Sequence, residues 1–217
     1  MMNTEMLQQL IQKSVAQEAT TGQLHQVLQQ RIETIERIVQ LPETEALERL
    51  YEFVVRYIEQ VPQMLEDLHQ GAIEAGLLHY VSPILEVVDG FFMAPPKELN
   101  QVSGLPALMN EAFLAHRLFE EVNDTYIMRV GQPMIPFDMT MSNVIVHSLI
   151  GEPFANELEQ VVMVAAKGIF GENKAYEGND KFLAFMDKKE NDNLVKIAQS
   201  WPCMSTQMGL DNHLQFA

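Results

Sequence analysis

Apolar residues recur at helical spacing through most of the chain, and turn-forming residues separate the periodic segments. In the first 40 residues there are two narrow stripes whose outer faces are rich in glutamine. They predict amphipathic helices over residues 4–18 and 23–40, joined at Gly22 as a helical hairpin. The stripes consist of Leu7, Leu10, Ile11 and Val15, then Leu24, Val27, Leu28, Ile32, Ile35, Ile38 and Val39. So narrow a hairpin must pack on something, either the rest of the chain or a second copy.

The same period continues to residue 92, where prolines and a glycine set the expected boundaries. Pro62 predicts a stop or a kink, because proline lacks the amide proton that a helix interior needs. Gly76 predicts a left-handed helix end, and Ser82-Pro83 predicts an N-cap followed by the first residue of a helix. The predicted helices span residues 43–60, 62–75 and 84–92.

Residues 105–151 form the segment around which the other predicted helices are organised. The pattern predicts helices over 106–130 and 139–150, joined by a loop that contains prolines. Ala112 and Ala115 would let neighbouring helices approach closely, which indicates a central position for the first helix. Five polar residues are expected on its outer side, namely Asn110, Glu111, Arg117, Glu121 and Asp124.

The apolar stripe over residues 153–170 is wide enough to predict a helix buried on most sides. Short helices are predicted over 180–186 and 193–200, and residues 202–217 have no clean period. No strand–turn–strand signal is present. We therefore expect an all-α fold, an irregular multi-helix bundle of about eight to ten helices with an N-terminal helical hairpin. Residues 1–40 would form that hairpin, for packing or dimerisation, and residues 41–217 the main helical domain.

The net charge of the chain restricts the ligands that it can bind. The 217 residues include 30 acidic and 14 basic side chains, so the formal net charge is −16. This balance repels phosphate groups and argues against general nucleic-acid binding and against docking on anionic lipid. No apolar run approaches the roughly 20 residues of a membrane helix, and the first residues do not resemble a secretory signal. The single cysteine, Cys203, has no partner for an intramolecular disulfide, so we expect a cytoplasmic protein.

Two histidines on the central helices are candidates for chemistry. His116 lies four residues before Glu120, and His147 lies four residues after Asn143. Residues four apart share a helix face, so the two pairs could ligate zinc or iron, or act as an acid–base pair. A structural role is favoured, because a buried histidine needs a partner in any case. Glu120 would then hold His116, and Asn143 or a backbone carbonyl would hold His147.

A Glu-x-x-His tetrad, Glu66 to His69, matches half of a carboxylate-bridged two-metal motif. The other half is missing, because no other histidine has a glutamate three residues before it. A pair of surface residues is the favoured explanation. The candidate metal ligands are thus His116, Glu120, His147, Glu66 and His69; the sequence requires no cofactor, and a transition metal is the alternative.

The 14 methionines and 11 phenylalanines fit a Met/Phe-lined pocket, although core filling explains them more simply. Nucleotide-binding glycine motifs, GxSxG, HExxH and paired CxxC are all absent, which favours a protein that is not an enzyme. The sequence therefore predicts a cytosolic interaction or scaffold protein that binds a protein partner and self-associates, as a homodimer or larger homo-oligomer. The alternatives are a metal-binding protein or metal-dependent enzyme, and a binder of a small apolar ligand.

Overall fold

The computed structural model describes residues 4–42, 44–95, 102–130, 135, 137–170, 179–181, 184 and 203–210. Within these residues the chain forms helices and no strand, and Asp138 and Cys203 form an isolated β-bridge. The all-α bundle is therefore confirmed, whereas the helices predicted over 180–186 and 193–200 fall largely outside the described residues. The helices are α1 (Thr4–Thr21), α2 (Gln23–Ile35), α3 (Ala46–Ala75), α4 (Leu78–Met93), α5 (Leu105–Val130), α6 (Thr140–Ile150), α7 (Phe154–Phe170) and α10 (Met204–Gln207).

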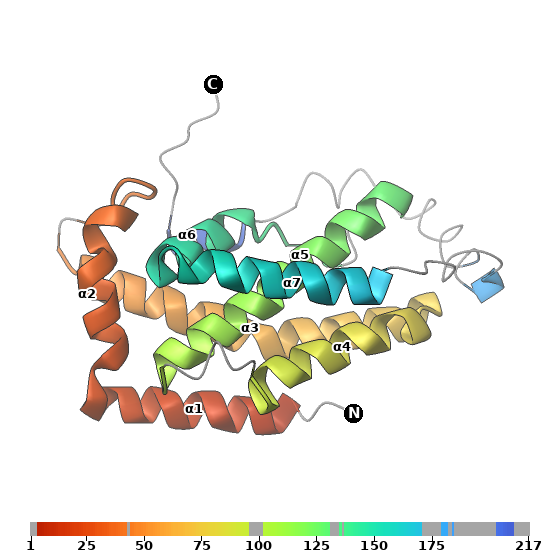
Figure 1. Ribbon diagram of the computed structural model, residues 1–217, viewed down its shortest axis with the longest axis horizontal. Helices are drawn as coiled ribbons and strands as arrows, with labels where there is room; N and C mark the ends of the chain where they lie inside the picture. The colour runs from red at the N-terminus through yellow and green to blue at the C-terminus, as the bar shows by residue number, and fades with distance from the viewer. Residues whose placement is uncertain are drawn as a thin grey trace.

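Helix α5 occupies the centre of the bundle (Figure 1) and packs against α1, α2, α3, α4, α6 and α7. Ala112 and Ala115 are fully buried, as the predicted central position requires. The prediction was wrong for Asn110 and Glu111, which are 4% and 6% exposed instead of lying outside. The reason is that neighbouring helices enclose the first half of α5, which therefore has no solvent-exposed face.

The N-terminal helices do not form the predicted hairpin. Helix α1 packs on α3 and α5, whereas α2 turns away from α1 and runs across the end of the bundle, packing on α3, α5 and α6 (Figure 1). Gly22 makes the turn with a φ of 60°, which is unstrained for glycine. Each apolar stripe thus faces the body, and Leu7, Ile11, Leu24 and Leu28 belong to the same core as the later helices.

Helix α3 runs unbroken through Pro62, so the predicted stop there is wrong. Pro62 is buried in the bundle, and the packing of the apolar turns around it outweighs one lost hydrogen bond. The predicted start at Ser82-Pro83 is also wrong, because α4 begins at Leu78 and Ser82 Oγ donates to the Leu78 carbonyl at 2.8 Å. Gly76 ends α3 with a φ of 72°, which confirms the left-handed end.

Helix α7 is covered on one side only, so the expectation of burial on most sides is wrong. Leu158 and Val162 are buried, while Met163 and Val164 are 44% and 70% exposed. The extra width of the apolar stripe therefore lies on the surface. The short helix α10 packs on α6, an element that the irregular pattern after residue 202 did not predict. No described helix has the length and apolar character that crossing a bilayer requires.

Candidate functional site

A hollow of about 320 Å³ opens between α5, α6 and α7. The α6 residues that line it follow one another at helical spacing, so they share one face. Helix α5 contributes two charged residues and α7 a third, which places three ionic groups from two helices in one small space. The lining is Arg117, Glu120, Thr140, Asn143, Val144, His147, Ser148 and Glu159.

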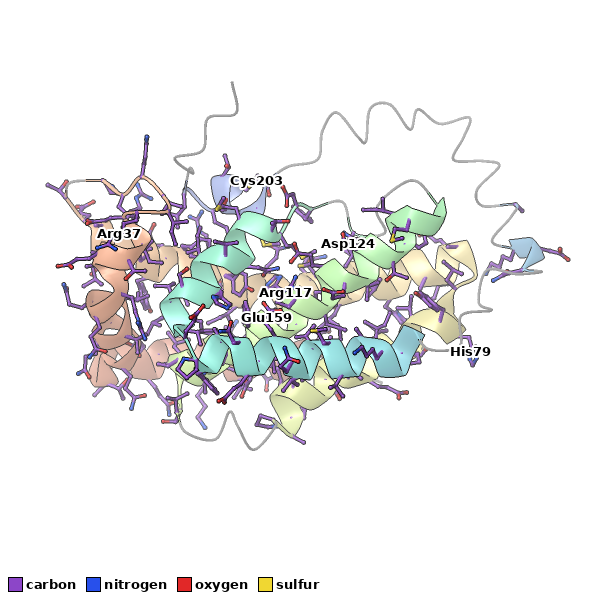
Figure 2. The ribbon with its side chains drawn as sticks, turned by 45° about the horizontal axis from the view of Figure 1, so that its top comes forward. Arg37, His79, Arg117, Asp124, Glu159 and Cys203 are labelled. Carbon is purple, nitrogen blue, oxygen red and sulfur yellow. The ribbon has the colours of Figure 1, made fainter. Side chains whose placement is uncertain are left out.

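Arg117 joins α5 to α7. Its Nε donates to Glu159 Oε1 and Oε2 at 2.9 and 3.0 Å, and Figure 2 shows the two side chains next to each other. Its Nη1 donates to Glu120 and its Nη2 to Glu121 Oε1 at 3.3 Å. Burial lowers the pKa of the guanidinium, but Glu120 and Glu159 more than reverse this, so the pKa is raised overall. Each of the three guanidinium nitrogens thus donates to a carboxylate.

Glu120 connects the same cluster to α6. Its Oε1 accepts from the Thr140 hydroxyl at 2.8 Å, and its Oε2 accepts from Asn143 Nδ2 at 2.6 Å. The Asn143 Oδ1 in turn accepts from the Tyr57 hydroxyl of α3 at 2.7 Å. Burial, and then the charge of Glu120, raise the pKa of Tyr57 well above its ordinary value. A continuous chain of hydrogen bonds therefore links α3, α6, α5 and α7.

His116 lies in the core, fully buried, and does not line the hollow. Its Nε2 donates to the Tyr57 carbonyl oxygen at 2.8 Å, which leaves the lone pair on Nδ1. Its ring packs on the Tyr57 ring at a centroid distance of 4.0 Å. Burial lowers the pKa of His116 to about 4, although the bond to Tyr57 opposes the shift. The predicted partner, Glu120, was therefore wrong.

His147 borders the hollow, and its Nε2 pairs with Asn156 Oδ1 of α7 at 3.1 Å. The expected partner, Asn143, is instead bonded to Tyr57 and Glu120. The Phe113 and His147 rings pack edge-to-face at a centroid distance of 6.0 Å. The structure thus brings Glu120 and His147 to one hollow.

The other two predicted ligands, Glu66 and His69, line a separate groove between α3 and α4. Within the described parts of the chain, no three His, Cys, Asp or Glu side chains are grouped to hold a metal ion. The metal hypothesis therefore remains a prediction without a grouped donor set in the described structure. Sequence reasoning missed the parts played by Tyr57 and Glu159. No local pattern pointed to them, because Tyr57 is 86 residues from its partner Asn143 in sequence and Glu159 is 42 residues from its partner Arg117.

Hydrogen-bonding capacity indicates which ligand the hollow accepts. Each donor group of Arg117, Thr140, Asn143 and Ser148 already bonds to at least one protein oxygen. Carboxylate and hydroxyl oxygens keep unused lone pairs, so the lining mostly offers acceptors. The carboxylates of Glu120 and Glu159 exceed the single charge of Arg117 by one, and Glu121 adds another negative charge beside it. Such a site favours an ammonium or guanidinium group.

Asp124 extends this negative field along α5 beyond the hollow, as Figure 2 indicates. Burial raises the pKa of Asp124, and the charge of Glu120 raises it further.

Comparison of the whole chain with family models, curated proteins and solved structures gave no match. Its own residues are therefore the basis for an assignment.

Proposed function

We propose that the protein is a non-catalytic cytosolic interaction protein that binds a basic segment of a partner protein. The head group of a lysine or arginine of the partner occupies the hollow between α5, α6 and α7. The observation that carries this proposal is the combination of a net negative lining with donor groups that each already bond to a protein oxygen. A ligand that only donates hydrogen bonds complements such a lining.

Exposed apolar side chains beside the hollow support a protein partner over a free cation. Val144, which lines the hollow, is 43% exposed. Met163, one helical turn after Glu159 on α7, is 44% exposed. Protein interfaces combine such apolar contacts with buried charged anchors. The net charge of −16 would also speed the approach of a basic partner.

Self-association has less support than the sequence suggested. The stripes of α1 and α2, which motivated that expectation, pack within the same chain. Two copies that brought their acidic surfaces together would repel each other. The proposed partner is therefore a different, basic chain.

The test is a titration of the methyl-labelled full chain with a short, capped peptide of lysine and leucine, followed by NMR. We expect the methyl signals of Val144 and Met163 to shift. Glu159→Gln and Val144→Ala should each weaken binding about fivefold, the first by removing charge and the second by removing apolar contact. The matched control is Glu157→Gln, an exposed position on α7 outside the lining.

Equal affinity in the wild type, Glu159→Gln and Val144→Ala would refute the proposal, as would unshifted Val144 and Met163 methyls. Unfolding midpoints of each variant show whether a loss of binding reflects a loss of folding. Light scattering of the free chain tests the alternative, self-association. If the chain forms a stable dimer and Val144→Ala dissociates it, this surface binds a second copy instead of a basic partner.

A further inference from the structure

A second, larger depression of about 450 Å³ lies between α3 and α4, beside the first residue of α1. It shares no lining residue with the hollow at Arg117. From α4 its lining takes residues 78, 82, 85, 86 and 89, which follow one face of the helix. At about 1.5 Å per residue these positions extend about 16 Å, or three helical turns. The depression is thus an elongated groove.

Leucines form the apolar part of the groove. Leu65 of α3 is buried at 1% exposure, Leu85 of α4 is partly buried, and Leu78 is 37% exposed. The exposure of these leucines increases from the floor of the groove to its rim. Apolar side chains of a partner can therefore contact them without rearrangement of the core. Helical partners commonly dock this way, with apolar residues at one face inserted in a groove.

Carboxylates surround these leucines. Glu66, Glu86 and Asp89 line the groove, and among its described lining residues there is no lysine or arginine. Glu66 accepts one hydrogen bond, from the Thr4 hydroxyl at 3.0 Å. Glu86 and Asp89 have no ion-pair or hydrogen-bond partner among the described residues. In contrast to the hollow, the groove therefore has negative charges that no cation of the described part of the chain neutralises.

We propose that this groove docks an amphipathic, basic helix of a partner protein. Leucines of that helix contact Leu65, Leu78 and Leu85, and its lysines or arginines face Glu86 and Asp89. The length of the groove fits about three turns of helix, and its charge excludes an acidic partner, a second copy of this chain included. A protein with this groove and the hollow would contact basic partners at two separate surfaces.

The test uses the methyl-labelled full chain and a synthetic peptide with lysine and leucine at helical spacing. We expect the Leu78 and Leu85 methyl signals to shift, and the peptide to gain helical circular dichroism when bound. The double variant Glu86→Gln/Asp89→Asn should weaken binding about fivefold, and Leu78→Ala about threefold. The control with the same charge change is Glu152→Gln/Glu157→Gln, both exposed and outside either lining.

The same peptide with a central proline separates a helical from an extended occupant, because proline breaks the helix without changing the charge. Equal binding of the proline peptide would overturn the proposal, and so would shifts confined to Val144 and Met163. Conversely, shifts at Leu78 and Leu85 without shifts at Val144 would support the groove and leave the proposed function of the hollow refuted. Tighter binding by a long-chain alkylamine than by the helical peptide would assign the groove to a small amphiphile.

Discussion

Glu111 and Glu120 lie nine residues apart on the central helix α5, in very different surroundings. Glu111 is 6% exposed and has no hydrogen-bond or ion-pair partner among the described residues. Burial alone raises its pKa to about 7. The Glu120 side chain, at 16% exposure, accepts from Arg117, Thr140 and Asn143. The same residue type is thus unpaired in the first half of the helix and fully paired in the second.

The difference shows what makes a buried carboxylate useful. An ionised carboxylate without donors opposes folding, whereas one with three donors can hold neighbouring helices in fixed positions. In the second half of α5, Arg117 supplies the charge that Glu120 needs, and α6 supplies the neutral donors. The hollow proposed to bind a partner therefore depends on the paired end of α5, and the unpaired end reduces the stability of the fold.

Removing the central cation should have the largest effect. Arg117→Ala leaves Glu120 and Glu159 without their charged donor, and their side chains are only 16% and 26% exposed. We expect a loss of about 3 kcal/mol in the free energy of unfolding, measured by urea denaturation. The control, Arg49→Ala, removes an exposed pair with Glu52 and should cost at most about 0.5 kcal/mol. Equal costs would mean that the pairing around Glu120 does not stabilise the helices.

Neutralising the unpaired carboxylate should have a comparable effect of opposite sign. Glu111 binds its proton more tightly in the folded protein. Below pH 4.5, its ordinary pKa, the side chain is protonated in both states and costs the fold nothing. As the pH rises from 4.5 to about 7, Glu111 loses its proton in the unfolded chain before it does so in the folded one. The free energy of unfolding therefore falls over this range. At about 1.4 kcal/mol per pKa unit, the full cost above pH 7 is about 3 kcal/mol. Glu111→Gln should recover most of it.

This gain is measured by urea denaturation of the wild type and of Glu111→Gln at about pH 8 and at pH 4.5. The two proteins should differ at the higher pH and be nearly equal at the lower one. Glu157→Gln, exposed on α7, controls for the change in net charge. A destabilised Glu111→Gln at pH 8 would show that the ionised carboxylate has a favourable partner.

The helical period predicted the all-α fold and most of the helix positions. Apolar spacing reports which face of a segment is buried, and that information is local. The errors at Pro62, at Ser82-Pro83 and at the N-terminal hairpin have one cause. Local rules favoured a break or a pairing, and packing of each helix against the body of the protein was stronger.

The candidate site could be predicted only in part. The sequence singled out Glu120, Asn143 and His147, which line the hollow, because they repeat at helical spacing on two adjacent helices. It did not identify Glu159 or Tyr57 as their partners, since contacts across 42 or 86 residues leave no local pattern. Burial of Glu111 was likewise hidden, because a polar residue is normally placed outside.

His116 lies between the two glutamates in sequence and offers a test at acid pH. Its folded pKa of about 4 is below the ordinary 6.5, so folding favours the neutral ring. Stability from this group is complete above pH 6.5 and falls as the pH drops towards 4. We expect this group to contribute a loss of about 2 kcal/mol between pH 7 and about pH 5, opposite in sign to the contribution of Glu111. The amide of His116→Gln can still donate to the Tyr57 carbonyl, so in urea denaturation this variant should gain about 2 kcal/mol relative to the wild type over this range.

The smallest effect is expected at the buried end of the network. Tyr57→Phe removes the hydroxyl that donates to Asn143 Oδ1 at 2.7 Å and leaves this acceptor without that donor. We expect a loss of about 1 kcal/mol, measured by urea denaturation. Tyr51→Phe is the matched control, because the Tyr51 hydroxyl has no hydrogen-bond partner among the described residues; it should cost less than about 0.5 kcal/mol.

A double-mutant cycle between Tyr57→Phe and Asn143→Ala separates the hydrogen bond from packing of the ring. If the bond connects α3 to the paired end of α5, the two changes should be non-additive by about 1 kcal/mol. Additive costs would mean that the network ends at Asn143. In that case the glutamate that is paired on α5 would connect three helices instead of four, and Arg117, Thr140 and Asn143 would still account for the contrast with Glu111.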